Sequence, residues 1–148
     1  MAQSTVDQVL QQGIAAHKEG RLTEAEHLYR VILQSQPTHP HANHNLGLLF
    51  TLADKDNEAL PFFQRAVEAN PTIEQFWLSY IDALIKERQF DNASLVLKKA
   101  KTKGVKEEKL NLLQSRLLLI TQVTPNLAIS TIDQSSPQKC LELSEKYK

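Results

Sequence analysis

The stretch of residues 40–73, PHANHNLGLLFTLADKDNEALPFFQRAVEANPTI, decides the fold because its pattern recurs along the chain at a spacing of 34 residues. Within it, Asn57 is followed two residues later by Ala59 and six residues later by Phe63. The same triplet stands one spacing earlier and one spacing later, as Thr23, Ala25 and Tyr29 and as Asp91, Ala93 and Leu97. A period of this length is typical of a repeat architecture in which each unit is a pair of helices.

The ends of these helices are marked by particular residue types. The residues that predict the start of each second helix have side-chain oxygens suited to an N-cap, and they are Thr23, Asn57 and Asp91. Glu26 stands three residues after the first of them, which predicts a capping box. Gly20 predicts a left-handed turn between the two helices of the first unit. Two prolines, Pro37 and Pro71, predict where the second helices end.

The chain resembles an array of tetratricopeptide repeats (TPR). The family's hallmark positions in the second unit hold Asn43, Leu46, Gly47, Phe50, Ala59, Phe63, Ala66 and Pro71. Only Asn43 departs from the pattern, because a Trp or another large residue is usual there. The resemblance implies an all-α, right-handed superhelical solenoid of antiparallel helix pairs, with three repeats over about 6–39, 40–73 and 74–107. The glycines of the first helices, Gly13 and Gly47, are expected to let paired helices approach closely.

The third repeat is followed by a further helical pattern. Leu110, Leu113, Leu117 and Ile120 share one helical face, which predicts a capping helix over about 107–122 and an array over 6–122. Residues 123–148 are expected to form a linker and a partial C-terminal helix, because polar residues and proline become frequent there. A decayed second helix of a fourth repeat is the alternative. Since the pattern stops midway at Lys148, we expect an N-terminal piece of a longer protein.

The resemblance also implies a binding surface, because the first helices of TPR arrays line a concave groove. The groove residues expected in this chain are His17, Lys18, His41, His44, Asn45, Leu48, Thr51, Gln75, Ser79, Asp82 and Lys86. Such a mixture of apolar and polar groups suits a protein or peptide segment. Asn45 is the most informative position, because its amide both donates to and accepts from a peptide backbone. The alternative is that Asn45 is only a solvated surface residue.

Two known uses of TPR arrays were weighed against this groove. A carboxylate clamp holds acidic chaperone tails with two Lys, one Arg and two Asn. The matching positions here are Leu10, Ile14, Asn45, Gln75 and Ser79, so the cations are missing and no clamp is expected. Residues 16–26, 41–47 and 74–85 are similar to the N-terminal repeats of bacterial proteins that continue into a glycosyltransferase of the O-linked N-acetylglucosamine transferase type or into a sulfotransferase. That similarity implies an alternative role as the substrate-recognition or dimerisation arm of a transferase.

Composition excludes several classes of function. The 148 residues include 17 basic and 17 acidic side chains, so the zero net charge gives no general attraction to nucleic acid or to an anionic membrane. A single cysteine, Cys140, excludes an intramolecular disulfide, and no secretion signal or membrane-spanning run is evident. We therefore expect a cytoplasmic protein. No catalytic or cofactor-binding motif is present, which predicts a non-enzyme without cofactors.

Three smaller features complete the expectations. His39, His41 and His44 are close in sequence, but no local Glu or Cys completes a metal site, and a pH-dependent charge in the groove is the alternative. Trp77 is expected in the core and Phe76 at the surface. The sequence thus predicts a protein-interaction scaffold. A homodimer through the last helix is the remaining alternative, and it would be favoured by exposure of Leu112, Leu117, Leu118 and Leu119.

Overall fold

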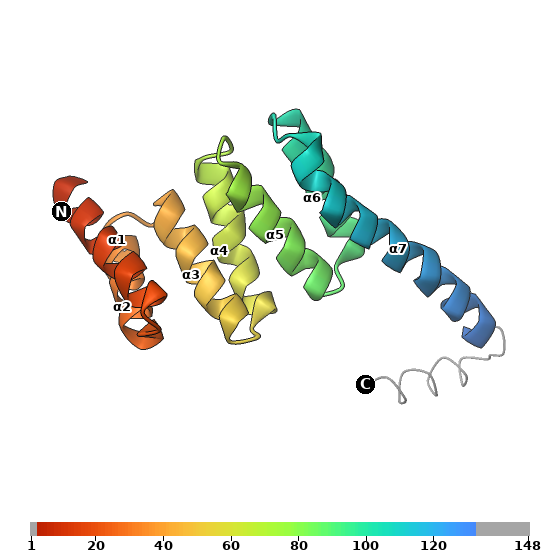
Figure 1. The fold of residues 1–148 in the computed structure, drawn as a ribbon, viewed down its shortest axis with the longest axis horizontal. Coiled ribbons are helices and arrows are strands. Elements are labelled where there is room, and N and C mark those ends of the chain that lie inside the picture. Colours follow the sequence, from red (N-terminus) through yellow and green to blue (C-terminus); the bar gives the residue numbers. More distant parts are fainter. Residues whose placement is uncertain (1–2, 133–148) are drawn as a thin grey trace.

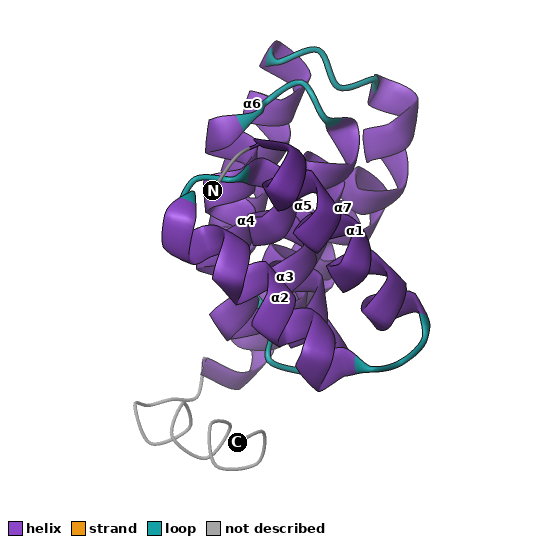
Figure 2. Cartoon of the chain, turned by 90° about the vertical axis from the view of Figure 1, so that its left-hand side faces the viewer, coloured by secondary structure: helices purple, strands orange, loops and turns teal. Residues whose placement is uncertain are grey.

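The computed structural model describes residues 3–132, with side chains described for residues 5–122. Over that range the regular elements are all α-helices: α1 (Gln3–Lys18), α2 (Leu22–Ser35), α3 (Pro40–Leu52), α4 (Asp56–Ala69), α5 (Glu74–Lys86), α6 (Phe90–Thr102) and α7 (Glu107–Ile132). Figure 1 shows them side by side in an elongated array, with α1 and α7 at opposite ends. Figure 2, a view turned by 90°, shows that the loops between them are short.

The helices form two rows. Neighbours along the chain pack against each other, and α1 also contacts α3, α3 contacts α5, and α5 contacts α7. These first helices of the pairs make one row, and α2, α4 and α6 make the other (Figure 1). We call the outer surface of the first row the A-helix face and that of the second row the B-helix face. The arrangement confirms the predicted all-α helical-repeat solenoid.

Each of the first two pairs is held by an aromatic ring that lies on the bare backbone of a glycine. A Cβ atom on Gly47 would lie 2.6 Å from Cε1 of Phe63, and one on Gly13 would lie 2.7 Å from Cε1 of Tyr29. Both rings are fully buried. The third pair fills the same space differently, with Ile81 in the first helix opposite the smaller Leu97, and both are buried. Close approach of the paired helices at the two glycines is therefore confirmed.

The buried residues fall into separate clusters along the array. One cluster joins α1, α2 and α3 around Tyr29 and Leu46. Another joins the end of α4 to α5, α6 and α7 around Trp77 and Leu110. A small third cluster, made of Ala59, Phe63 and Ala83, lies between them. The core is therefore divided, as expected for a stack in which each pair contacts only its neighbours.

The turns inside the pairs share one backbone conformation. Gly20 has the predicted left-handed geometry, with φ of 81°. Asp54 and Arg88 occupy the same place in the next two pairs, with φ of 59° and 61°. This conformation is mildly strained for residues that carry a Cβ atom. The same turn is thus used in every pair, although only the first has glycine.

The predicted N-caps are wrong. The N-cap positions of α2, α4 and α6 are two residues earlier, at Arg21, Lys55 and Gln89, and none makes a side-chain cap hydrogen bond. The residues expected there, Thr23, Asn57 and Asp91, lie inside the first helical turn. The capping box to Glu26 is absent for the same reason. The chain enters the helix directly after the left-handed residue of each turn, which leaves no extended residue at the predicted position.

Asn43, which stands where the family pattern has a large residue, makes the same kind of hydrogen bond as Trp77 makes one repeat later. Its amide nitrogen donates to the carbonyl oxygens of Pro37, at 3.1 Å, and His39, at 2.9 Å. One repeat later, Nε1 of Trp77 donates to the carbonyl oxygen of Pro71 at 2.9 Å. Both side chains are buried, as expected for Trp77. Each therefore ties the start of a first helix to the loop that precedes it.

The last helix extends beyond the predicted end at residue 122, because α7 continues to Ile132. Residues 123–132 are therefore neither a linker nor a separate second helix. The polar residues that suggested a linker lower helix propensity by only about 0.5 kcal/mol each, which does not by itself end a helix. The rest of that segment, residues 133–148 with Cys140, lies outside the described residues, so the predicted partial C-terminal helix stays a prediction there. Within the described residues, no helix combines the length and apolarity needed to cross a membrane.

His44, predicted as an exposed groove residue, is buried between the second and third pairs. Its side chain is 5 % exposed, and its ring centroid lies 4.6 Å from that of Phe76 and 5.6 Å from that of Phe63. Its Nε2 atom lies 2.8 Å from Oγ of Ser79. Phe76, expected at the surface, is buried as well, because the rings of His41 and His44 cover it. Burial lowers the pKa of His44 to about 4.

Replacement of Gly47 by alanine should destabilise the fold by about 1–2 kcal/mol. The added methyl group would overlap the ring of Phe63, and this overlap outweighs the gain in helix propensity, which is about 1 kcal/mol. Urea unfolding would measure the change. In a Phe63→Leu background the same substitution should be neutral or stabilising. An equal loss in both backgrounds would contradict the ring contact as the cause.

Stability should fall as the pH decreases from about 6.5 to about 4 because of His44. Its pKa is lower in the folded chain than the ordinary value of 6.5, so the folded state binds fewer protons in that range. The contribution is complete above pH 6.5 and decreases by up to about 3 kcal/mol toward pH 4. Urea unfolding across this range should show a shallower slope for His44→Phe combined with Ser79→Ala. Parallel slopes would contradict the assignment.

Candidate protein-binding face

The structure places the predicted groove residues on α1, α3 and α5, the first helices in Figure 1. Four of them are exposed, namely Lys18, His41, Gln75 and Lys86. Six are half-buried, namely His17, Asn45, Leu48, Thr51, Ser79 and Asp82. Only His44 is removed from the surface, because the third pair packs on it.

At the N-terminal end of this face, two predicted residues meet at a buried hydroxyl. Nδ1 of His17 lies 3.4 Å from the hydroxyl of Tyr29, which comes from α2. Burial raises the pKa of Tyr29 to about 12, and the side chain of Asn45 acts weakly in the opposite direction. The Tyr29 hydroxyl therefore stays protonated at neutral pH. Asn45 is partly engaged within the chain, so it is neither fully solvated nor wholly free for a partner.

In the middle of the face, polar groups form a short chain from the surface to the interior. Nε2 of Gln75 donates to Oγ of Ser79 at 3.2 Å. The same oxygen lies 2.8 Å from Nε2 of His44, in a hydrogen bond whose direction depends on the tautomer of the imidazole. Burial favours the neutral form of His44, which has one donor and one acceptor nitrogen. The exposed end of this chain is the amide of Gln75.

At the C-terminal end, α5 is joined to α7 by an ion pair that the sequence analysis missed. Nη1 of Arg116 lies 2.6 Å from Oδ1 of Asp82, and Nζ of Lys86 lies 3.3 Å from Oδ2. Arg116 follows Asp82 by 34 residues, so an extension of the repeat by one more unit would have found it. Because Asp82 is one of the predicted groove residues, the same extension continues their row onto α7.

Two exposed leucines of α7 lie on the same side of that helix as Arg116. Leu112 and Leu119 stand one repeat after Leu78 and Ile85, and they are 71 % and 63 % exposed. They lie seven residues apart on one side of the helix, with Arg116 between them. The A-helix face therefore mixes polar and apolar groups on α1, α3 and α5, and it adds two strongly exposed apolar side chains on α7.

The three neighbouring histidines, His39, His41 and His44, make different contacts. Nδ1 of His39 accepts from the backbone nitrogen of Ala42 at 3.1 Å and caps α3, while His41 contacts the edge of Phe76. Burial lowers the pKa of both His39 and His44, so a groove charge near neutral pH is wrong for these two residues. Among the described residues, no group of three or more His, Cys, Asp or Glu side chains is placed to hold a metal.

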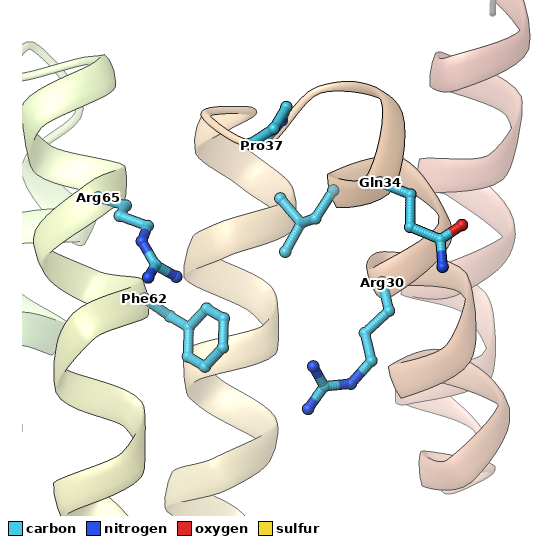
Figure 3. A pocket seen from close by; sticks show the side chains of 6 residues that line it. Arg30, Gln34, Pro37, Phe62 and Arg65 are labelled. Carbon is cyan, nitrogen blue, oxygen red and sulfur yellow. The ribbon is translucent and has the colours of Figure 1, made fainter.

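The A-helix face is an open surface. Four hollows lie in the described part of the chain at other places, and none of them is lined by a predicted groove residue. One of them, of about 530 Å³, lies between α2 and α4 on the B-helix face (Figure 3). A partner on the A-helix face would therefore lie across side chains from several helices and would not enter an enclosed cavity.

Comparison with known proteins identifies the fold. No family model and no curated protein sequence matches the chain. The TPR domain of P58(IPK) matches with a TM-score of 0.75 and 19 % identity, over 96 % of this chain and 40 % of that one. The first TPR domain of Spaghetti (RPAP3), bound to the HSP90 peptide SRMEEVD, matches with a TM-score of 0.70 and 15 % identity, over 84 % and 97 %.

A bacterial structure gives the same result. The type III secretion chaperone SycD of Yersinia enterocolitica, in complex with a peptide of the translocator YopD, matches with a TM-score of 0.66 and 11 % identity. The match covers 82 % of this chain and 93 % of SycD. At such identities the likeness concerns the fold alone. The chain is thus an all-α solenoid with the fold of tetratricopeptide repeat domains.

Proposed function

We propose that the chain is a protein-interaction module that binds a peptide or protein segment across its A-helix face. The observation that carries this proposal is the exposure of Leu112 and Leu119 on the A-helix face, which also holds the polar groups of α3 and α5. Exposed apolar side chains beside polar ones are typical of binding surfaces. Two of the similar structures contain bound peptides, which supports the same class of function here.

The two ends of the face suit different parts of a bound segment. Apolar side chains of the partner would pack on Leu112 and Leu119, and its backbone would meet the amides of Asn45 and Gln75. The Arg116–Asp82 pair is about one-third exposed on both sides and contributes little to stability, roughly 0–1 kcal/mol. It is therefore free to exchange partners at little cost. The helices are already formed, so ordering is needed mainly on the partner's side.

An acidic tail is not the ligand proposed for this face. Leu10, at one of the clamp positions, is 8 % exposed, and Ile14 at another is half-buried. Neither provides a charge to hold a carboxylate. The alternative role as the recognition arm of a glycosyltransferase or sulfotransferase would use the same face. That alternative stays a prediction, based on the similarity of residues 16–26, 41–47 and 74–85 to such arrays.

Self-association through α7 is a second candidate, and one observation favours it. Leu118 is 51 % exposed and lines a hollow of about 160 Å³ between α6 and α7. It lies on a different side of α7 from Leu112 and Leu119, because successive helical residues are rotated by about 100°. Of the four leucines whose exposure was expected to support this candidate, Leu112, Leu118 and Leu119 are exposed and Leu117 is buried. The two surfaces are therefore separable by mutation.

Combined replacement of Leu112 and Leu119 by serine should weaken binding on the A-helix face about tenfold or more, because it removes the apolar contact. Peptides would be selected from a displayed random library on the unmodified chain, and their affinities measured by fluorescence anisotropy. Leu95→Ser is the matched control, since Leu95 is also exposed, at 53 %, but lies on α6. Equal affinities for the control and the double variant would contradict the proposal.

If α7 mediates self-association, Leu118→Ser should reduce the molecular mass in solution to that of a single chain. The reason is that a serine removes the apolar group from the edge of the α6–α7 hollow. Sedimentation equilibrium over a range of concentrations would measure this. The Leu112 and Leu119 double variant should keep the mass of the unmodified chain. A chain that is monomeric at every concentration would exclude this candidate.

A further inference from the structure

The hollow between α2 and α4 combines an apolar floor with two cations. It has a volume of about 530 Å³ and is lined by Arg30, Leu33, Gln34, Pro37, Phe62 and Arg65. In Figure 3 the guanidinium groups of Arg30 and Arg65 come from opposite sides, with Phe62 between them. No acidic side chain lines this hollow. Its lining is thus apolar, polar and positively charged.

Both guanidinium groups are held against aromatic rings. The Arg65 guanidinium carbon lies 5.3 Å from the ring centroid of Phe62, and that of Arg30 lies 5.8 Å from the centroid of Phe50. The two rings are stacked, with centroids 5.5 Å apart and planes inclined by 13°. These contacts restrict the arginine side chains, so less conformational entropy is lost when they bind an anion.

Most donors of these arginines are left for a ligand. Arg30 is bound to Glu26 through Nε alone, at 2.9 Å, which leaves its terminal nitrogens without a described acceptor. Within the described residues, Arg65 has its ring contact and no ion pair. Arginine uses two parallel N–H groups to bind one carboxylate. The hollow therefore has charge and geometry that the fold itself does not use.

The next pair of helices provides an internal comparison. An equivalent hollow of about 410 Å³ lies there, and each of the six lining positions recurs 34 residues later, as Gln64, Val67, Glu68, Pro71, Val96 and Lys99. At the equivalent positions Gln64 replaces Arg30, Val96 replaces Phe62 and Glu68 replaces Gln34, while Trp77, Tyr80 and Lys103 also line this second hollow. The fold thus makes a hollow in both places, while the paired arginines occur only in the first. Packing of the repeats does not require them.

We propose that the hollow between α2 and α4 is a second docking site, on the B-helix face, for an acidic segment of a partner protein. A carboxylate of that segment pairs with the Arg65 guanidinium, a second one pairs with Arg30, and an apolar side chain between them rests on Phe62 and Leu33. Charge complementarity selects this occupant, because the lining has two cations and no acidic group, and within the described part of the chain only Arg30 of the two is paired, with Glu26 beside the hollow. The site is independent of the A-helix face.

The probe for this site is a fluorescein-labelled peptide of sequence Gly-Glu-Phe-Glu-Gly, with Gly-Gln-Phe-Gln-Gly as its uncharged counterpart. Fluorescence anisotropy would be measured with the whole chain at about 0.05 M and about 0.3 M NaCl, because ion pairs on a surface weaken with salt. Arg65→Gln should weaken binding of the acidic peptide about tenfold, and Arg30→Gln should weaken it several-fold. Arg65→Lys should lie between Arg65→Gln and the unmodified chain, since it keeps the charge but loses the bidentate geometry.

Two controls separate this site from general electrostatic attraction and from the A-helix face. Lys99→Gln, at the position equivalent to Arg65 in the next hollow, and the Leu112 and Leu119 double variant should both bind the acidic peptide normally. The proposal is overturned if the acidic peptide does not bind, if the uncharged peptide binds equally well, or if Lys99→Gln has the same effect as Arg65→Gln. Should Arg65→Gln fail to fold, as judged by circular dichroism, Arg30→Gln provides the same comparison.

Discussion

The structure depends on the contact, in the first two pairs, between an aromatic ring of the second helix and the bare backbone of a glycine in the first helix. Tyr29 on Gly13 and Phe63 on Gly47 bring the paired helices so close that no Cβ atom fits between them. Because this distance is set inside each pair, the pairs have similar shapes and stack in two rows. The two faces of the molecule follow from that stacking.

The two faces then differ in how their side chains are used. On the A-helix face, successive first helices are joined by polar contacts such as His44 with Ser79 and Asp82 with Arg116. On the B-helix face, the second helices leave hollows between them, and aromatic rings and arginines line one of these. One repeat pattern thus supports two chemically distinct surfaces. Each surface can change in sequence without altering the helix pairs.

Much of the fold could be predicted from the sequence, because a period of 34 residues places small and large apolar groups on opposing helices. The glycine contacts and the turn at Gly20 follow from local geometry. The helix starts do not, since the left-handed turn residue, not the polar residue after it, decides where α4 and α6 begin. Local periodicity likewise cannot show that α7 continues past residue 122.

The residues of the candidate site were harder to predict, because their exposure depends on how one helix pair packs against the next. Helical spacing puts His44 on an exposed stripe, but the third pair brings Phe76 and Ser79 onto it. Arg116 could have been predicted, because it continues the 34-residue repeat by one unit. The hollow lined by Arg30 and Arg65 could not have been predicted, because it forms between α2 and α4, which are separated in the chain by the whole of α3.

The divided core has a consequence for cooperativity. The cluster around Tyr29 ends at α3 and the cluster around Trp77 begins at the end of α4, and they are connected by Ala59, Phe63 and Ala83 with partly buried side chains such as Phe50 and Leu60. In a linear stack, the weakest interface sets the boundary between units that open independently. Because α2 packs on α3 less extensively than α4 packs on α5, the joint between the first and second pairs is a more natural hinge than the joint between the second and third. Rotation there would alter the curvature of both faces while every helix stays intact.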